Sequence, residues 1–147
     1  VLVCCGGGGL TSGIALALEA EAPGLRARPV EPEGFDDVAR SLISGTRQTN
    51  ERRTGSICDA VITPTPGALT FPIMQRLCGP AQVVSDEDAL RAMAVAFIRL
   101  KIVLEPGGAI ALAAALYHTE GDRDVIVVAS GGNVDAVVFQ EALERFG

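Results

Sequence analysis

Aromatic residues and lysine are nearly missing from this chain of 147 residues. It contains no Trp, one Tyr and five Phe, so a hydrophobic core must be built mainly from Ala, Val, Leu and Ile. Small and branched aliphatic side chains of this kind suit helices packed on a buried sheet. Eleven of the twelve basic residues are Arg, which leaves Lys101 as the single candidate for any chemistry that needs a lysine.

Clustered positive charge and long apolar runs are also lacking. The net charge is −6, and Arg52 and Arg53 form only an isolated basic pair. Recognition of a phosphate backbone needs grouped Lys and Arg, so we expect no nucleic-acid partner. No apolar run reaches the roughly 20 residues that span a bilayer, and no charged segment precedes Val1 to form a signal peptide. The sequence predicts a cytoplasmic protein with no membrane segment.

The four cysteines, Cys4, Cys5, Cys58 and Cys78, form neither a metal motif nor a disulfide framework. They lack CxxC spacing, and their density is below that of small secreted domains stabilised by disulfides. We expect buried thiols, of which Cys4 and Cys5 fill space beside a glycine-rich loop.

Short apolar runs alternate along the chain with segments that have helical spacing. Strands are predicted at residues 1–5, 26–30, 81–84 and 124–129. Helices are predicted at residues 11–22, 36–44, 69–77, 86–101, 106–118 and 135–146, with Ser85 and Asp88 as a capping box. Because alternating strands and helices pair in parallel through right-handed crossovers, we predict one α/β domain over residues 1–147, with a parallel sheet covered by helices on both faces.

Two glycine-rich loops follow predicted strands, at residues 6–9 and 130–133. Ligands of parallel sheets bind beyond the carboxyl ends of strands, so these loops are the first candidates for a site. Four consecutive glycines cost backbone entropy, and a plain turn rarely needs all four. The pattern favours a nest of N–H groups that binds a phosphate at a helix N-terminus, with a tight strand-to-helix connection as the alternative.

A dinucleotide site is a further alternative, because Glu31 ends the second predicted strand at about the distance expected of a ribose-binding acid. The glycine spacing argues against it. Starting GxGxxG at Gly6 places the third glycine on Thr11, and starting at Gly7 places it on Ser12.

Three motifs taken together resemble the fold type II pyridoxal-phosphate (PLP) enzymes, in particular the serine racemase and serine/threonine or 3-hydroxyaspartate dehydratase family. They are the tetraglycine loop, the Glu105-Pro106-Gly107-Gly108 run and the Ser130-Gly131-Gly132-Asn133 run. Their order and spacing cover nearly the whole chain. The resemblance implies that the chain is most of the large, cofactor-binding domain and the C-terminal portion of a longer enzyme.

The resemblance also implies a set of cofactor-binding residues. The phosphate of PLP is assigned to the tetraglycine loop, and Ser130 is assigned to the pyridine nitrogen. A neutral hydroxyl there makes the ring a weaker electron sink than a carboxylate would, which suits elimination of a β-hydroxyl. Glu105 is expected close to the ring. The full set is Gly6, Gly7, Gly8, Gly9, Leu10, Glu105, Ser130 and Gly131.

Two residues depart from the family pattern. The family often has Ser, Thr or Ala where Gly107 stands, and a glycine where Ala60 stands. These departures affect the expected contacts around the cofactor ring.

Glu31, Phe35 and Asp37 have the spacing at which serine racemase and the hydroxyaspartate dehydratases bind Mg²⁺, Mn²⁺ or Ca²⁺. Two carboxylates and the Phe35 carbonyl are oxygen ligands of the kind that hard cations prefer. Without the resemblance, an acid at a strand end and an acid at a helix N-terminus would explain the same residues.

The lysine that holds PLP and acts as the base at Cα lies upstream of the tetraglycine loop in this family, and no such residue precedes the loop here. We therefore expect an absent N-terminal region to supply it, and this chain alone to be inactive. The whole enzyme is expected to be a homodimer that deaminates a small hydroxy-amino acid. Racemisation and a non-catalytic phosphate-binding module remain alternatives.

Overall fold

The computed structural model describes residues 1–119 and 124–147 of the chain. Three short strands form a parallel sheet in the order β1-β2-β3: β1 (Leu2–Cys4), β2 (Arg28–Pro32) and β3 (Gln82–Val84). All three residues of β1 are buried, as the apolar run at the start of the sequence predicted. The remaining elements are the helices α1 (Gly9–Glu21), α2 (Asp37–Ser44), α3 (Thr70–Leu77), α4 (Asp86–Val95), α5 (Pro106–Tyr117) and α6 (Ala136–Phe146), with the short helical turns η1 (Asp59–Val61) and η2 (Ala96–Leu100).

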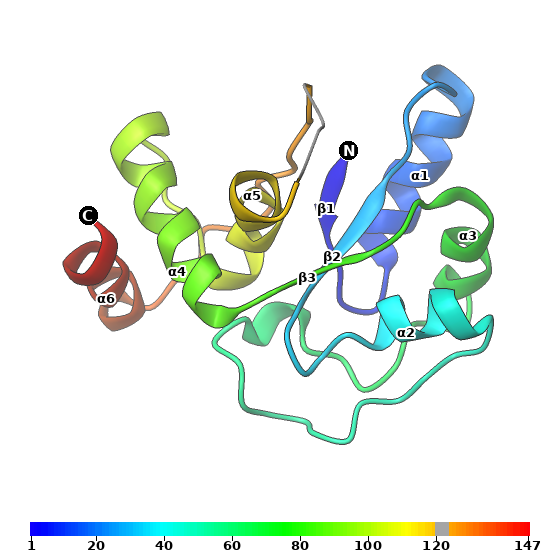
Figure 1. The fold of residues 1–147 in the computed structure, drawn as a ribbon, viewed down its shortest axis with the longest axis horizontal. Coiled ribbons are helices and arrows are strands. Elements are labelled where there is room, and N and C mark those ends of the chain that lie inside the picture. Colours follow the sequence, from blue (N-terminus) through cyan, green and yellow to red (C-terminus); the bar gives the residue numbers. More distant parts are fainter. Residues whose placement is uncertain (120–123) are drawn as a thin grey trace.

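Helices cover both faces of the sheet, as predicted. On one side α1 contacts β1, α2 contacts β2, and α3 contacts α1 and α2. On the other side α5 contacts all three strands, α4 packs on α5, and α6 packs on α4 (Figure 1). The fold class predicted from the sequence is therefore confirmed.

Helix α5 can lie between the sheet and α4 because most of its buried residues are small. Ala109, Ile110, Ala111, Ala113 and Ala114 are all completely buried. Alanine has the highest helix propensity and a short side chain, so it allows close approach on every side of the helix. The largest hydrophobic cluster of the described residues surrounds α5 and includes residues of β1, α4 and α6.

The predicted fourth strand at residues 124–129 is wrong as a strand. Only an isolated parallel bridge forms, between Val127 and Leu2, through Leu2 N donating to the Ile126 carbonyl and Val128 N donating to the Leu2 carbonyl. The backbone then turns towards α5, where the Gly131 carbonyl accepts from the Glu105 N–H. The segment still lies beside β1 and delivers its following loop to the same edge of the sheet.

Most predicted helix boundaries agree with the structure within two residues. Two features differ from the prediction: the end of the fourth helix and an additional short helical turn. The helix predicted to run to Lys101 ends as an α-helix at Val95 and continues as a π-helical turn, after which Lys101 has a left-handed backbone with φ of 61°. The turn η1 was not predicted. The capping box is confirmed, because Ser85 Oγ accepts from Asp88 N and the Asp88 carboxylate accepts from Ser85 N.

Candidate cofactor and active site

A cavity of about 280 Å³ opens at the carboxyl ends of β1 and of the bridged segment that precedes Ser130. The chain runs from β1 outward to β2 and β3 and returns to the opposite side of β1, so the cavity lies where the strand order reverses. Ligands of open α/β sheets bind at such positions. Its lining consists of Cys4, Cys5, Gly6, Gly7, Gly8, Gly9, Leu10, Thr11, Ala60, Val61, Glu105, Gly107 and Ser130.

The glycine loop between β1 and α1 is held from outside the cavity. The Gly7 carbonyl accepts from the Gly67 N–H at 3.0 Å and from the Thr70 hydroxyl. Gly8 has a left-handed backbone with φ of 88°, and a Cβ at this position would lie 2.5 Å from Met74 Cε. The fold therefore requires glycine at position 8 for both its backbone conformation and its contact with α3.

Gly7 and Gly9 have open space where a Cβ would be, with no atom within 4 Å. Within the described part of the chain, the N–H groups of Gly7, Gly8, Gly9 and Leu10 have no protein acceptor. Helix α1 begins at Gly9, has 13 residues and has no acidic residue in its first turn. Unpaired N–H groups at a helix N-terminus, backed by the helix dipole, form an anion site. This geometry fits the phosphate nest predicted from the sequence.

Ser130 reaches the same cavity from the other loop. Its Oγ lies 2.9 Å from Cys4 Sγ, at hydrogen-bond distance. Burial raises the pKa of the Cys4 thiol above 9.0, and the negative charge of Glu105 adds to this, while the hydrogen bond with Ser130 opposes it. The prediction that Cys4 only fills space is incomplete, because the structure gives its thiol a polar partner.

Glu105 is the residue directly before α5. Its backbone is extended, its side chain makes no capping hydrogen bond, and Pro106 follows at the first helical position. Close glycine contacts hold its loop against the loop after the bridged segment. A Cβ at Gly131 would lie 2.3 Å from Glu105 Oε1, and a Cβ at Gly108 would lie 2.4 Å from the Gly131 carbonyl oxygen. Gly131 does not line the cavity, but it is in contact with the Glu105 side chain, which does. The other seven residues assigned to cofactor binding all line the cavity.

The two departures from the family pattern lie next to each other. A Cβ added at Gly107 would be 3.4 Å from the Cβ of Ala60. The chain therefore places a methyl group at position 60 and none at position 107, where the resemblance leads one to expect the reverse. At this wall of the cavity the methyl group therefore comes from η1 and not from α5.

Glu31 lies in β2, and Phe35 and Asp37 follow that strand at the same edge of the sheet, but all three lie outside this cavity. Both Glu31 carboxylate oxygens accept N–H groups at the start of α2, Oε1 from Val38 at 2.8 Å and Oε2 from Ala39 at 2.7 Å. Burial raises the pKa of Glu31 to about 8 despite these bonds. Burial also raises the pKa of Asp37 to about 6.

One oxygen in this acidic group has no partner. Asp37 Oδ1 accepts from Asn50 at 2.6 Å, whereas the buried Oδ2 has no hydrogen-bond partner among the described residues. The negative charge of Asp37 adds to the burial that raises the pKa of Glu31, so the two acids interact. A buried pair of carboxylates with an unused oxygen fits a divalent cation chemically.

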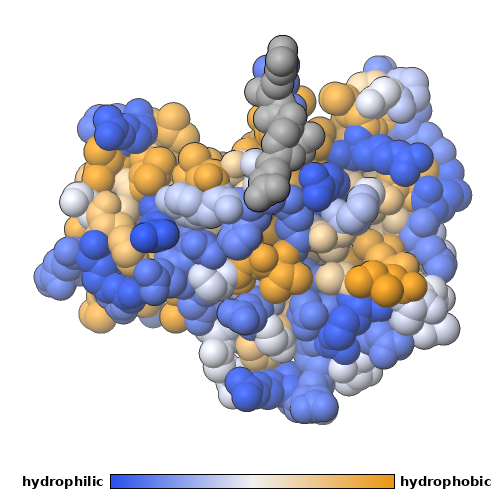
Figure 2. Space-filling view, in the orientation of Figure 1, coloured by the Kyte–Doolittle hydropathy of each residue, from blue (hydrophilic) through white to orange (hydrophobic). Residues whose placement is uncertain are grey.

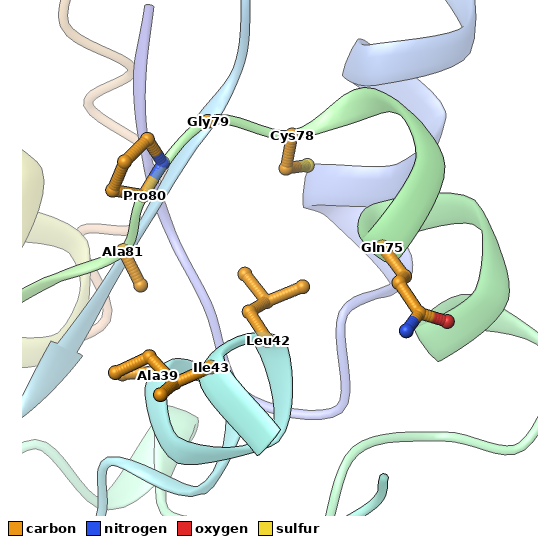
Figure 3. Close-up of a pocket in the computed structure, with 8 residues that line it drawn as sticks. All are labelled: Ala39, Leu42, Ile43, Gln75, Cys78, Gly79, Pro80 and Ala81. Atoms are coloured by element: carbon orange, nitrogen blue, oxygen red, sulfur yellow. The ribbon is translucent and has the colours of Figure 1, made fainter. Parts of the chain in front are cut away.

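A second cavity, of about 340 Å³, lies between α2 and the connection from α3 to β3 (Figure 3). Ala39, Leu42, Ile43, Pro80 and Ala81 make its wall apolar, with Gln75, Cys78 and Gly79 completing it. This lining contains no acid, base or free N–H cluster of the kind that holds a phosphate. The cavity beside the glycine loop is therefore the better candidate for chemistry.

Lys101, the only lysine, is exposed at the end of η2 and does not line the glycine-loop cavity. No helix of the described residues has the length and apolar content needed to cross a membrane.

A parallel α/β domain with a glycine nest and a hydroxyl in one cavity defines a phosphate-cofactor-binding fold. Comparison with known proteins identifies the class: residues 1–134 match the family of pyridoxal-phosphate dependent enzymes, and the chain belongs to this family. The predicted cofactor, PLP, and the predicted family are confirmed.

The similar proteins include racemases and dehydratases. The chain is 36% identical to serine racemase from Dictyostelium discoideum over 92% of its length and 43% of the relative. It is 35% identical to the catabolic L-threonine dehydratase of Escherichia coli (strain K12), over 92% of this chain and 42% of that protein. The crystal structure of a threonine deaminase from T.th. matches with a TM-score of 0.84 and 40% identity, covering 91% of this chain and 48% of that one. The chain thus spans less than half the length of these relatives.

Proposed function

We propose that this chain is the C-terminal, cofactor-binding part of a longer PLP-dependent enzyme that deaminates a hydroxy-amino acid by β-elimination. The observation that carries the proposal is the presence of the glycine nest and the Ser130 hydroxyl in a single cavity. Relatives named threonine dehydratase and serine racemase support the choice of substrate class. The remaining length of those relatives leaves room for a separate segment that carries the lysine.

The residues of this chain bind and orient the cofactor. The N–H groups of Gly7, Gly8 and Gly9 hold the phosphate, and the positive end of α1 adds a favourable potential. When bound, PLP supplies an electron sink for the carbanion at Cα. The Ser130 hydroxyl would hold the ring nitrogen of bound PLP without protonating it, and a neutral partner there would make PLP a moderate electron sink, which suits elimination of a β-hydroxyl group. The lysine is supplied from outside these 147 residues, because Lys101 is not in the cavity.

The similarity to serine racemases favours one alternative fate of the same carbanion, return of the proton to the opposite face of Cα. Both reactions use the same phosphate nest and the same hydroxyl, so the cavity supports each of them. Products separate the two: elimination releases a 2-oxo acid and ammonia, whereas racemisation gives the enantiomer of the substrate.

The test uses the full-length protein that contains this chain. Its visible absorbance in the presence of PLP should show the band of a lysine-bound cofactor, and borohydride should remove that band. Incubation with L-serine, L-threonine or 3-hydroxyaspartate should release 2-oxo acid and ammonia. Protein without the band, or a bound cofactor with no product from any of the three substrates, would show that the proposed activity is wrong.

We propose further that Glu31, Asp37 and the Phe35 carbonyl bind Mg²⁺, Mn²⁺ or Ca²⁺. The buried, unpaired Asp37 Oδ2 supports this assignment. A ligand that binds only the native state raises stability, so added Mg²⁺ should raise the melting temperature of EDTA-treated protein. Asp37→Asn should abolish that rise, and Ser44→Ala at the other end of α2 should leave it unchanged. An equal rise in the Asp37→Asn variant would contradict the site.

We also expect a homodimer in the cytoplasm. Apolar side chains are exposed in η2 and in the loop after it, namely Phe97, Ile98, Leu100, Ile102 and Val103. Figure 2 shows apolar side chains among hydrophilic ones on this side of the molecule. Such side chains support an interface with a second subunit. Light scattering on the full-length protein measures the mass, and a monomer at micromolar concentration would refute the dimer.

A further inference from the structure

Cys4 is held rigidly at the edge of the cavity. It is the last residue of β1, pairs with Val30 in the sheet and is 6% exposed. Its carbonyl accepts from Thr11 Oγ1 at 3.2 Å, which ties the end of the strand to the first turn of α1. The direction of its side chain is therefore fixed by the strand and by the helix that follows.

Ser130 has much weaker support. It follows a segment whose pairing with β1 ends at Val128, and its side chain is exposed. Within the described residues, the contact of its Oγ with Cys4 Sγ is its one hydrogen bond. The rotamer of Ser130 thus depends on a residue 126 positions away in the sequence.

The direction of this hydrogen bond matters for what Ser130 can do in the cavity. A serine hydroxyl has one proton to donate, and a thiol can act as weak donor or weak acceptor. If the serine donates to sulfur, its oxygen can only accept from a ligand. If the thiol donates to Oγ, the serine proton is free for an acceptor in the cavity. Burial raises the pKa of Cys4, so the thiol keeps the proton that it would donate.

We propose that Cys4 is a positioning residue: its thiol donates to Ser130 Oγ and thereby turns the serine proton towards the unprotonated ring nitrogen of the cofactor. This inference rests on the function proposed above. The cofactor contact is made by Ser130, and Cys4 acts only through it.

A double-mutant cycle on the affinity for PLP tests the coupling. The full-length protein and its variants are titrated with PLP after removal of the bound cofactor. We expect Cys4→Ala to weaken binding about fivefold, the effect of one hydrogen bond between neutral groups. Ser130→Ala should weaken it at least as much, and Cys4→Ala should add nothing in the Ser130→Ala background. Cys4→Ser, which keeps a donor, should restore affinity. Independent, multiplying effects of the two substitutions would overturn the proposal.

Cys58→Ala is the matched control. Cys58 is buried like Cys4 and its thiol donates to Asp86, but it does not line the cavity, so its removal tests the loss of a buried, hydrogen-bonded thiol away from Ser130. We expect its PLP affinity to equal that of the wild type. A fivefold loss in this variant would show that the effect of Cys4→Ala comes from packing.

A second measurement does not depend on the folding of any Cys4 variant. The S–H stretching band of a thiol moves to lower frequency when the thiol donates a hydrogen bond. Ser130→Ala removes the acceptor and leaves all four cysteines, so one thiol band should move to higher frequency. An unchanged infrared spectrum would overturn the proposal.

The outcomes also separate this proposal from the function on which it rests. Wild-type full-length protein that fails to bind PLP refutes the proposed function. Wild-type protein that binds PLP and loses affinity in Ser130→Ala, but not in Cys4→Ala, refutes only the role of Cys4.

Discussion

Gly8→Ala should damage the fold, whereas Gly9→Ala should damage only the binding of the phosphate. The two glycines are neighbours in one loop and face different constraints. Gly8 has φ of 88°, and its Cβ would lie 2.5 Å from Met74 Cε and 2.9 Å from Thr70 Oγ1. Gly9 has no such φ, and its Cβ would meet no atom within 4 Å.

The cost at Gly8 has two parts. A residue with a Cβ pays roughly 1–2 kcal/mol in the left-handed region. The added methyl also has to displace Met74, which is completely buried, and overpacking of this kind costs roughly 1–3 kcal/mol. Together they take about 2–5 kcal/mol from the free energy of unfolding, a large share of the roughly 5–15 kcal/mol typical of a domain. A fall of the melting temperature by on the order of 10 °C corresponds to this loss.

Thermal unfolding of the apo protein, followed by titration with PLP, separates the two variants. Gly9→Ala should melt at or slightly above the wild-type temperature, because alanine restricts the unfolded chain at a position whose native conformation it can adopt. It should nevertheless lose PLP affinity, since its methyl occupies space beside the N–H groups of the nest. A Gly8→Ala variant that melts with the wild type, or a Gly9→Ala variant that binds PLP normally, would refute the reasoning.

Three further substitutions have defined outcomes. Burial raises the pKa of Glu31 from 4.5 to about 8, so the folded chain keeps a proton that the unfolded chain releases, and stability should fall by up to about 1.4 kcal/mol per pH unit across that window in the apo protein. Urea unfolding of Glu31→Gln should lack this slope, and an equal slope would contradict the assignment. Gly107→Ala should leave stability within about 0.5 kcal/mol of wild type by the same measurement, because its nearest contact is at an ordinary distance of 3.4 Å. Burial acts to raise the pKa of Asp88, but hydrogen bonds with His118 and Ser85 lower it below 3.8 overall. Asp88→Ala should therefore cost about 1 kcal/mol near neutral pH, and this cost should shrink as the pH falls below the unfolded pKa; a cost that does not depend on pH would refute it.

The sequence predicted the elements of the fold well where local pattern determines them. β1 is buried on both faces, and its apolar run says so directly. The capping box before α4 is also a local signal, carried by Ser85 and Asp88. The segment at residues 124–129 has the composition of a strand, yet only one bridge forms. The segment pairs with β1 only as far as Val128, because the backbone then turns to the hydrogen bond between Gly131 and Glu105. That bond is a tertiary contact, which strand propensity cannot predict.

The candidate site shows the same division. The glycine nest could be predicted because four adjacent residues form it. The contact between Cys4 and Ser130 could not, since it joins positions 126 residues apart and neither residue type indicates the other. The support of the Gly7 carbonyl by Gly67 and Thr70 was missed for the same reason. The departures at positions 60 and 107 are both visible in the sequence. Their contact is not, because it joins two segments that are distant in sequence.

Glu31 in β2 and Asp37 at the start of α2 illustrate how two explanations of the same side chains can hold together. Glu31 uses both oxygens to accept N–H groups at the start of α2, which alone accounts for a buried acid at that position. Each carboxylate oxygen has a second lone pair, however, and the helix bonds leave it unused. A cation that shared these lone pairs with Asp37 Oδ2 would favour the ionised form of both acids and so lower the raised pKa of Glu31. If the proposed cation site is correct, adding Mg²⁺ should flatten the pH dependence that Glu31 gives to stability; an unchanged pH dependence would contradict the site.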